Sequence, residues 1–386
     1  MTVFSEPCPN LALVAQGGGQ KGVFTSGVLD AFQHARFDPF GLYIGVSAGA
    51  LNVASFVSRQ PQFGFRFISE LTTQDRFFNL FKFIRQQQSM DLDWLLKEAT
   101  SGGAIDLDFS TAQKTLSEGR HALAGVTHKS SLQDFYFPIF GHDWFTLAKA
   151  TCAIPMLFRE PVEMQGLYWV DGGVSSAIPV KEAIRQGAKQ IVIIRTEPIK
   201  EETMSSLANI EAGIEAWRKS VEAELPMYLA RLNLGAELDM LKSFHAQLAE
   251  KLQILKKEWL ESTVISNLSD EVSKKVGELK FTQGGGRWLF SGDHFYRLQA
   301  LKGRDFSPQM LDMLMSHYRN TEETAQLLSS LPSGIDVIQI APQKELLSSA
   351  LLSKQEELEA DYQHGYEVGE QFLNDWQNKR AMKIAL

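Results

Sequence analysis

Two short apolar segments, each followed closely by small residues, constrain the fold of this chain more than any other feature. Residues 11–15 are followed, after Gln16, by three consecutive glycines, and residues 42–46 are followed by a Ser-Ala-Gly sequence. Continuous apolar runs of this length are typical of strands buried on both faces of a parallel sheet. Beyond each run, over residues 24–35 and 48–57, apolar and small residues recur at helical spacing. The sequence therefore predicts strands that alternate with helices.

The same alternation continues to about residue 200. Residues 167–170 and 191–194 are further apolar runs, and residues 180–186 between them have a helical pattern that ends at Gly187. We predict an α/β fold, a three-layer sandwich in which a mostly parallel sheet carries helices on both faces. Residues 60–150 are less regular, and we expect helices and loops over the sheet there.

After residue 200 the sequence becomes mainly helical. Residues 207–221 and 241–259 carry apolar side chains at intervals of three and four, as amphipathic helices do. Residues 335–340 alternate as a strand that completes or flanks the core, and residues 346–373 are expected to be helical. We therefore divide the chain into an α/β domain, residues 1–200, and a mainly helical C-terminal region, residues 201–386.

Composition excludes several classes of protein. The 386 residues include 38 basic and 46 acidic side chains, a formal charge of −8, and 44% are hydrophobic. These values exclude a disordered chain or a disulfide scaffold, and the acidic balance argues against nucleic acid as the main partner. Cys8 and Cys152 are expected to be reduced thiols. With no signal-peptide pattern in residues 1–10 and no apolar run long enough to span a bilayer, we expect a cytoplasmic location, with peripheral contact at the inner membrane face left open.

The glycine-rich loop favours a ligand at the start of a helix. Glycines let main-chain N–H groups approach a ligand closely, at a helix end that attracts negative charge. Gly17, Gly19 and Gly22 also fit a dinucleotide fingerprint, but that motif needs an acidic residue after the next strand, and Asp38 precedes the strand. A phosphate loop is not supported because Gly22, rather than Ser or Thr, follows Lys21. A tight connection without a ligand remains the alternative.

A Gly-x-Ser-x-Gly sequence forms the second motif. Ser47 lies between Gly45 and Gly49, with an apolar strand before it and a helix of small residues after it. This context is typical of a nucleophile elbow, a strained turn that lifts a serine side chain clear of the sheet. An ordinary N-cap serine is the alternative, but it does not explain both glycines.

A serine nucleophile needs a base, and the sequence offers an acid at the end of a strand. Asp171 follows the apolar run and precedes Gly172 and Gly173, a composition also common in turns. A carboxylate serves as base when its surroundings tune its pKa towards the working pH. Histidine is the usual base, but none lies in a recognisable motif; the eight are His34, His121, His128, His142, His245, His294, His317 and His364.

Together with residues 150–155, a small-residue segment that ends in proline, these motifs resemble the patatin-like phospholipases in kind and in order. The resemblance covers about residues 10–200 and implies a Ser–Asp dyad, with Ser47 as nucleophile and Asp171 as base. It also implies an oxyanion hole formed by the amides of Gly17, Gly18 and Gly19, with Ala48 as a further donor. Residues that support the motifs are Lys21, at a position where the family has a basic residue, and Gly22, Gly45, Gly49, Gly172 and Gly173. The Asp361-Tyr362 and Gly365-Tyr366 pairs resemble a C-terminal extension of some bacterial members.

The resemblance implies a serine lipid acyl hydrolase, a phospholipase or esterase, that uses no cofactor and no metal. Its partner would be a lipid or another ester substrate. An acyltransferase on the same elbow, a lipid-binding protein without catalysis and a dinucleotide-binding module remain alternatives. Residues 63–83 are rich in phenylalanine, interleaved with basic residues that continue to residue 85. They fit an anionic membrane surface or, more simply, a core face, and the basic residues are Arg66, Arg76, Lys82 and Arg85. Residues 241–259 fit a lid or anchor, or plain helix packing.

Overall fold

A mixed β-sheet forms the centre of the protein in a computed structural model, which describes residues 6–199, except 80, 81, 83–86, 101, 142 and 156, and residues 308–384. The strand order is β5-β6-β3-β2-β1-β7-β8, and β4 pairs with β3 beside this path. The parallel pairs involve β1 (Cys8–Ala15), β2 (Phe40–Val46), β3 (His121–His128), β7 (Gln190–Ile194) and β8 (Asp336–Ile340). The antiparallel pairs add β4 (Asp134–Pro138), β5 (Val162–Met164) and β6 (Leu167–Asp171).

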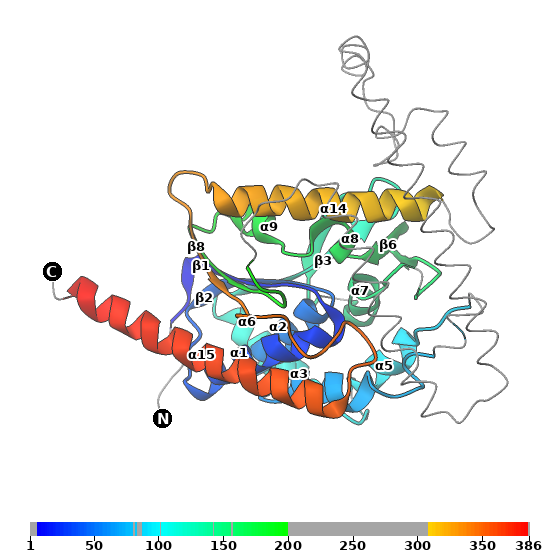
Figure 1. The fold of residues 1–386 in the computed structure, drawn as a ribbon, viewed down its shortest axis with the longest axis horizontal. Helices are drawn as coiled ribbons and strands as arrows, with labels where there is room; N and C mark the ends of the chain where they lie inside the picture. Colours follow the sequence, from blue (N-terminus) through cyan, green and yellow to red (C-terminus); the bar gives the residue numbers. More distant parts are fainter. Residues whose placement is uncertain are drawn as a thin grey trace, which may run out of the picture.

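Helices cover both faces of the sheet, as predicted (Figure 1). Successive side chains of β1 enter two different cores: Leu11 and Leu13 join the larger one, whereas Ala12 and Val14 join the other. A strand buried on both faces explains why this segment is continuously apolar. The larger core lies under α1 (Gly22–His34), α2 (Ala48–Val57) and α15 (Gln355–Ile384). The other face carries α8 (Gly173–Ser176), α9 (Val180–Arg185) and α14 (Pro308–Ser329).

Shorter elements occupy the stretch for which we predicted only helices and loops. That prediction was wrong at β3 and β4. β3 contains Ala122, Ala124 and Gly125, small residues that fit its crowded position between three neighbouring strands but give little of the β-branched signal expected of a strand. The helical elements of this stretch are α3 (Phe63–Arg66), the π-helical turn η2 (Phe67–Leu71), α5 (Leu92–Glu98), α6 (Phe109–Ser117) and α7 (Trp144–Thr151).

The C-terminal residues are built into the same sheet and helix layer. The predicted strand at 335–340 is present as β8, which pairs in parallel with β7. The predicted helix over residues 346–373 begins only at Gln355, because residues 346–353 make hydrogen bonds to other parts of the fold in place of helical ones. The predicted helices at 207–221 and 241–259 lie outside the described residues.

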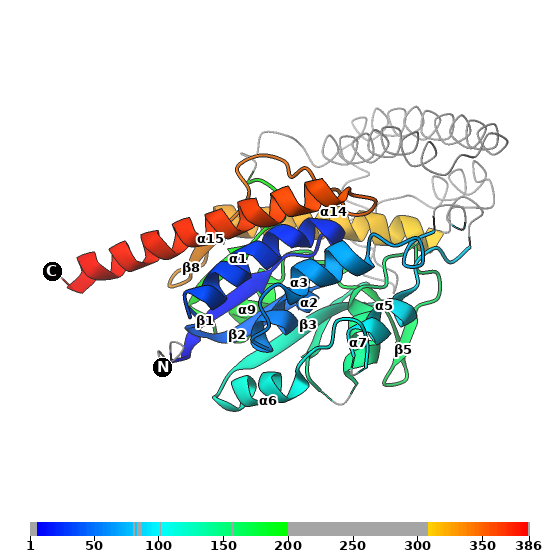
Figure 2. The ribbon, with the colours of Figure 1, turned by 90° about the horizontal axis from the view of Figure 1, so that it is seen from below.

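Helix α15 lies along α1 at very short range (Figure 2). A Cβ atom on Gly365 would lie 2.1 Å from the Phe24 carbonyl oxygen, and one on Gly27 would lie 2.1 Å from the Tyr362 carbonyl oxygen. The Tyr362 hydroxyl also donates to Asp30 of α1 over 2.8 Å. Tyr362 and Gly365, noted in the sequence near the end of the chain, therefore attach the C-terminal helix to the first helix of the fold.

We predict that Gly365→Val destabilises the protein by about 1–3 kcal/mol, because a side chain at this position overpacks the helix contact. Urea-induced unfolding measures the change. Ala360→Val is the matched control, since it places the same side chain on the exposed face of the same helix and is expected to cost less than about 1 kcal/mol. Equal losses in the two variants would contradict the close packing.

Candidate active site

Ser47 occupies a strained turn between β2 and α2. Its φ angle is 54°, in the left-handed region that non-glycine residues seldom adopt. A Cβ atom on Gly45 would lie 2.5 Å from the Gly49 carbonyl oxygen, and one on Gly49 would lie 2.5 Å from the Ala15 carbonyl oxygen. Both flanking glycines are thus required by the close approach of main-chain atoms, which is the geometry of a nucleophile elbow.

The turn is held by hydrogen bonds of Thr151, a residue that the sequence analysis did not single out. The Ser47 amide donates to the Thr151 hydroxyl over 2.9 Å, and that hydroxyl donates to the Gly125 carbonyl oxygen over 2.6 Å. Thr151 therefore joins the elbow to strand β3. Its signal in the sequence was its place in the small-residue segment 150–155, but nothing there indicated which member of the segment mattered.

Asp171 comes to the elbow because the end of β6 runs beside residues 151–153. Its amide donates to the Ala153 carbonyl oxygen over 3.0 Å, and the next amide, of Gly172, donates to Thr151 over 3.4 Å. Gly172 must lack a side chain, since a Cβ atom there would lie 2.3 Å from the Gly125 carbonyl oxygen. Strand β3 and segment 151–153 thus hold both the elbow and the acid.

Asp171 is a buried residue, 7% exposed, and its carboxyl group has an altered pKa. Burial raises the pKa from its ordinary value of 3.8 to about 6, against the lowering effects of the Gly173 amide, which donates to Oδ1 over 2.7 Å, and of the Ser47 side chain. Oδ2 is buried and has no hydrogen-bond partner among the described residues. The site therefore holds a carboxylate with one unused oxygen beside a serine.

The glycine loop supplies fewer free amides than the resemblance implied. The Gly17 amide donates to the Ala177 carbonyl oxygen over 3.1 Å, so it is already engaged within the fold. No hydrogen bond is recorded for the amides of Gly18, Gly19 and Ala48 among the described residues. Gly19 and Ala48 line the same pocket as Ser47, whereas Gly18 packs against Thr196. We therefore remove Gly17 from the set of candidate donors.

Two other predicted residues support the loop from outside the pocket. The Lys21 ammonium lies 3.5 Å from a carboxylate oxygen of Glu197 and does not line the pocket. A Cβ atom on Gly22 would lie 3.1 Å from Ala48 Cβ, so this glycine lets α1 approach α2. The Asn52 side chain strengthens that contact by donating to the Gly22 carbonyl oxygen over 2.9 Å.

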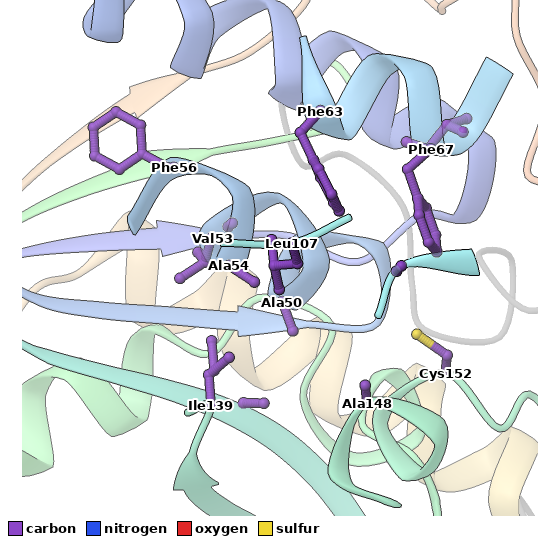
Figure 3. Close-up of a cluster of buried hydrophobic side chains, with 14 of the residues drawn as sticks. Ala50, Val53, Ala54, Phe56, Phe63, Phe67, Leu107, Ile139, Ala148 and Cys152 are labelled. Atoms are coloured by element: carbon purple, nitrogen blue, oxygen red, sulfur yellow. The ribbon is translucent and has the colours of Figure 1, made fainter. Parts of the chain in front are cut away.

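An apolar pocket opens beside Ser47. Figure 3 shows Phe63 and Phe67 projecting into this region from α3 and η2, with Cys152 on the opposite side. These phenylalanines are almost fully buried, so the core interpretation of residues 63–83 describes them better than an exposed membrane surface. Other apolar side chains that line the pocket are Leu51, Ile68, Phe77, Met90, Leu92, Leu95, Ile154 and Leu351.

The thiol of Cys152 also lines this pocket but is not a nucleophile. Burial, followed by the charge of Asp171, raises the pKa of the thiol far above its usual range, against a lowering effect of Ser47. The thiol therefore stays protonated at neutral pH, and both cysteines are free.

In the described part of the chain, no group of three or more His, Cys, Asp or Glu side chains is arranged to hold a metal ion, and no helix is both long and apolar enough to cross a bilayer.

One histidine reaches the edge of the site. His317 of α14 lies with Nδ1 2.7 Å from the carbonyl oxygen of Gly173, two residues beyond Asp171. This hydrogen bond is to the main chain, and it is made when Nδ1 carries the proton. His317 thus supports the turn that follows the acid.

The fold and site define a three-layer α/β protein with a serine elbow and a buried carboxylate. Residues 13–184 match the family model described as patatin-like phospholipase, and residues 307–379 match a domain of unknown function (DUF6363). Residues 13–184 are therefore similar to the patatin-like phospholipases over a little less than half of the chain.

A curated relative is the uncharacterized protein YjjU of Escherichia coli (strain K12), 42% identical over 188 residues, which are 49% of this chain and 52% of YjjU. The chain thus spans about half the length of the curated relative it matches. The crystal structure of VipD from Legionella pneumophila is 13% identical, with a TM-score of 0.32, and the match covers 56% of this chain and 55% of VipD.

Because the folded protein holds the Asp171 proton more tightly than the unfolded chain does, stability falls as the pH rises from about 4 to about 6. We predict that Asp171→Asn raises the urea midpoint of unfolding at pH 8, where the parent carries a buried charge. The difference should shrink below pH 4, where both side chains are neutral. A variant that is less stable than the parent at pH 8 would contradict this account of the buried carboxylate.

Proposed function

We propose that the protein is a serine lipid acyl hydrolase in which Ser47 and Asp171 form a catalytic dyad. One observation carries the proposal: a serine in a strained elbow lies beside a buried carboxylate, one oxygen of which has no hydrogen-bond partner in the described part of the chain, at the side of an apolar pocket. The strained backbone of Ser47 and the buried carboxyl group of Asp171 both lower the stability of the fold, and such destabilising features are typical of functional sites.

In the first step, Ser47 Oγ attacks the carbonyl carbon of an ester while Asp171 Oδ2 accepts the hydroxyl proton. The tetrahedral intermediate then collapses, the bond to the alcohol oxygen breaks, and the protonated Asp171 gives its proton to the leaving alcohol. An acyl group remains on Ser47.

In the second step, Asp171 takes a proton from a water molecule, whose oxygen attacks the acyl carbon. Collapse of the second intermediate breaks the bond to Ser47 Oγ, which recovers its proton from Asp171. The products are a carboxylic acid and the free enzyme, so a single carboxylate serves twice as base and twice as acid.

The negative charge on the carbonyl oxygen needs donors beside Ser47. The amides of Gly19 and Ala48 are the best placed because both residues line the pocket, with Gly18 as a further candidate. The Ala48 amide also begins α2, where the helix dipole favours negative charge. Losing one such donor typically lowers the rate by a factor of about 10² to 10³.

The apolar lining favours a lipid ester as substrate. A pocket with mostly hydrocarbon walls is suited to an alkyl chain and offers little to a charged or sugar group. The family match supports the same substrate class.

We predict that the protein reacts with a fluorophosphonate probe at Ser47 and hydrolyses p-nitrophenyl butyrate. Ser47→Ala is expected to lose labelling, and Asp171→Asn is expected to lower kcat by a factor of about 10² to 10⁴ while the protein stays folded. Ser55→Ala, on the same helix but outside the pocket, is the matched control. Hydrolysis by Ser47→Ala at the parental rate would contradict the proposal, and labelling without hydrolysis would favour acyl transfer.

We also predict a single ascending limb in the pH dependence of kcat/KM, with its midpoint near pH 6. Asp171 must be ionised to accept the serine proton, and burial raises its pKa to about 6, so activity falls below that pH. Initial rates with p-nitrophenyl butyrate from pH 4.5 to 8 measure the profile. A rate independent of pH across that interval would exclude Asp171 as the base.

A further inference from the structure

The segment between β8 and α15 crosses directly over the glycine loop. The Gln20 amide donates to the Ala350 carbonyl oxygen over 2.9 Å, and the Ser353 amide donates to Gln20 Oε1 over 2.8 Å. Gln20 is only 2% exposed, and its Nε2 donates to both the carbonyl and the hydroxyl oxygens of Thr72. A single buried side chain therefore joins the glycine loop to η2 and to residues 346–353.

The other end of this segment is anchored on α15. Asp361, which is 4% exposed, accepts hydrogen bonds from the Ser348 amide over 2.7 Å and from the Leu347 amide over 3.2 Å. The Ser348 hydroxyl donates to the same carboxylate over 2.6 Å. Since both ends are held by buried polar groups, residues 346–353 are a fixed part of the structure around the site.

The glycine loop is shaped to receive the segment. Gly19 has a φ of +58°, and a Cβ atom there would lie 2.3 Å from the Ala350 carbonyl oxygen. Glycine is thus required at this position by contact with the C-terminal part of the chain as well as by the turn itself. The glycine loop beside Ser47 and residues 346–353 therefore pack against each other closely.

Two residues of the segment face the pocket. Ala350 and Leu351 line it together with Ser47 and Ile68. Leu351 is half-buried and packs against the larger core, whereas Leu347, four residues earlier, is 64% exposed and does not line the pocket. The same short segment therefore presents one leucine to the pocket and one to solvent.

We propose that residues 346–353 form a wall of the substrate pocket and that Leu351 limits the length of the acyl chain bound beside Ser47. This inference rests on the proposed function. Residues 346–353 lie in the region that matches only a domain of unknown function. On this proposal they help to determine the substrate specificity of the site formed by residues 13–184. One extra methylene in an apolar pocket changes the discrimination between ligands by a factor of about 10 or more, so a side chain that shortens the pocket discriminates strongly between acyl chains.

A binding experiment tests the wall without relying on catalysis. The full chain carrying Ser47→Ala is titrated with cis-parinaric acid, a fluorescent fatty acid, which is then displaced by decanoate or butyrate. Adding Leu351→Trp is expected to lower the affinity for decanoate relative to butyrate by at least about 10-fold, and Leu351→Ala is expected to raise that ratio. Leu347→Trp, the same enlargement on the exposed side of the segment, should leave the ratio unchanged. Equal ratios in both Trp variants and in Leu351→Ala would overturn the proposal.

Kinetics separate the failure of this inference from failure of the proposed function. With Ser47 intact, the ratio of kcat/KM for p-nitrophenyl decanoate over p-nitrophenyl butyrate should change in the same order as the binding ratio. Hydrolysis of both esters with one ratio in all variants would overturn the wall and leave the hydrolase standing. No hydrolysis by the parent, combined with the expected binding ratios, would refute the hydrolase and support the wall.

Discussion

The hydroxyl group of Thr151 is the contact on which the site depends. It accepts a hydrogen bond from the Ser47 amide and donates one to the Gly125 carbonyl oxygen. Gly172 lies so close to the same oxygen that no side chain fits between them. One main-chain oxygen within β3, that of Gly125, is therefore the common reference point for the serine elbow and for Asp171. Because β2 and β6 both pair with β3, the sheet itself sets the distance between Ser47 and Asp171.

The burial that gives Asp171 a pKa of about 6 opposes stability. An ionised carboxylate away from water is unfavourable, and here Oδ1 accepts from the Gly173 amide while Oδ2 has no hydrogen-bond partner among the described residues. The surrounding core must offset this cost together with the strain at Ser47. Such a cost is understandable where the carboxylate must be ionised at neutral pH and still basic enough to accept a proton.

The C-terminal residues are continuous with the rest of the fold. β8 extends the sheet beyond β7, α15 packs along α1 through glycines on both helices, and the segment between them lies over the glycine loop. A cluster of buried polar groups, centred on Gln20 and Asp361, fixes that segment. Removing this part of the chain would expose the glycine loop and one side of the pocket, so it cannot be regarded as a simple appendage.

The sequence by itself determined the repeating local features. Continuous apolar runs fixed β1, β2 and β7, and the glycines around Ser47 fixed a strained turn, because such patterns depend on neighbours along the chain. Only the tertiary structure decided which amides of the glycine loop stay free, why β3 is a strand despite its small residues, and that Leu351 reaches the pocket. Each of these depends on contacts between segments far apart in the chain, such as Gly17 with Ala177 or Gln20 with Ser353. The order of apolar and polar residues within one segment does not predict which distant segment it will contact.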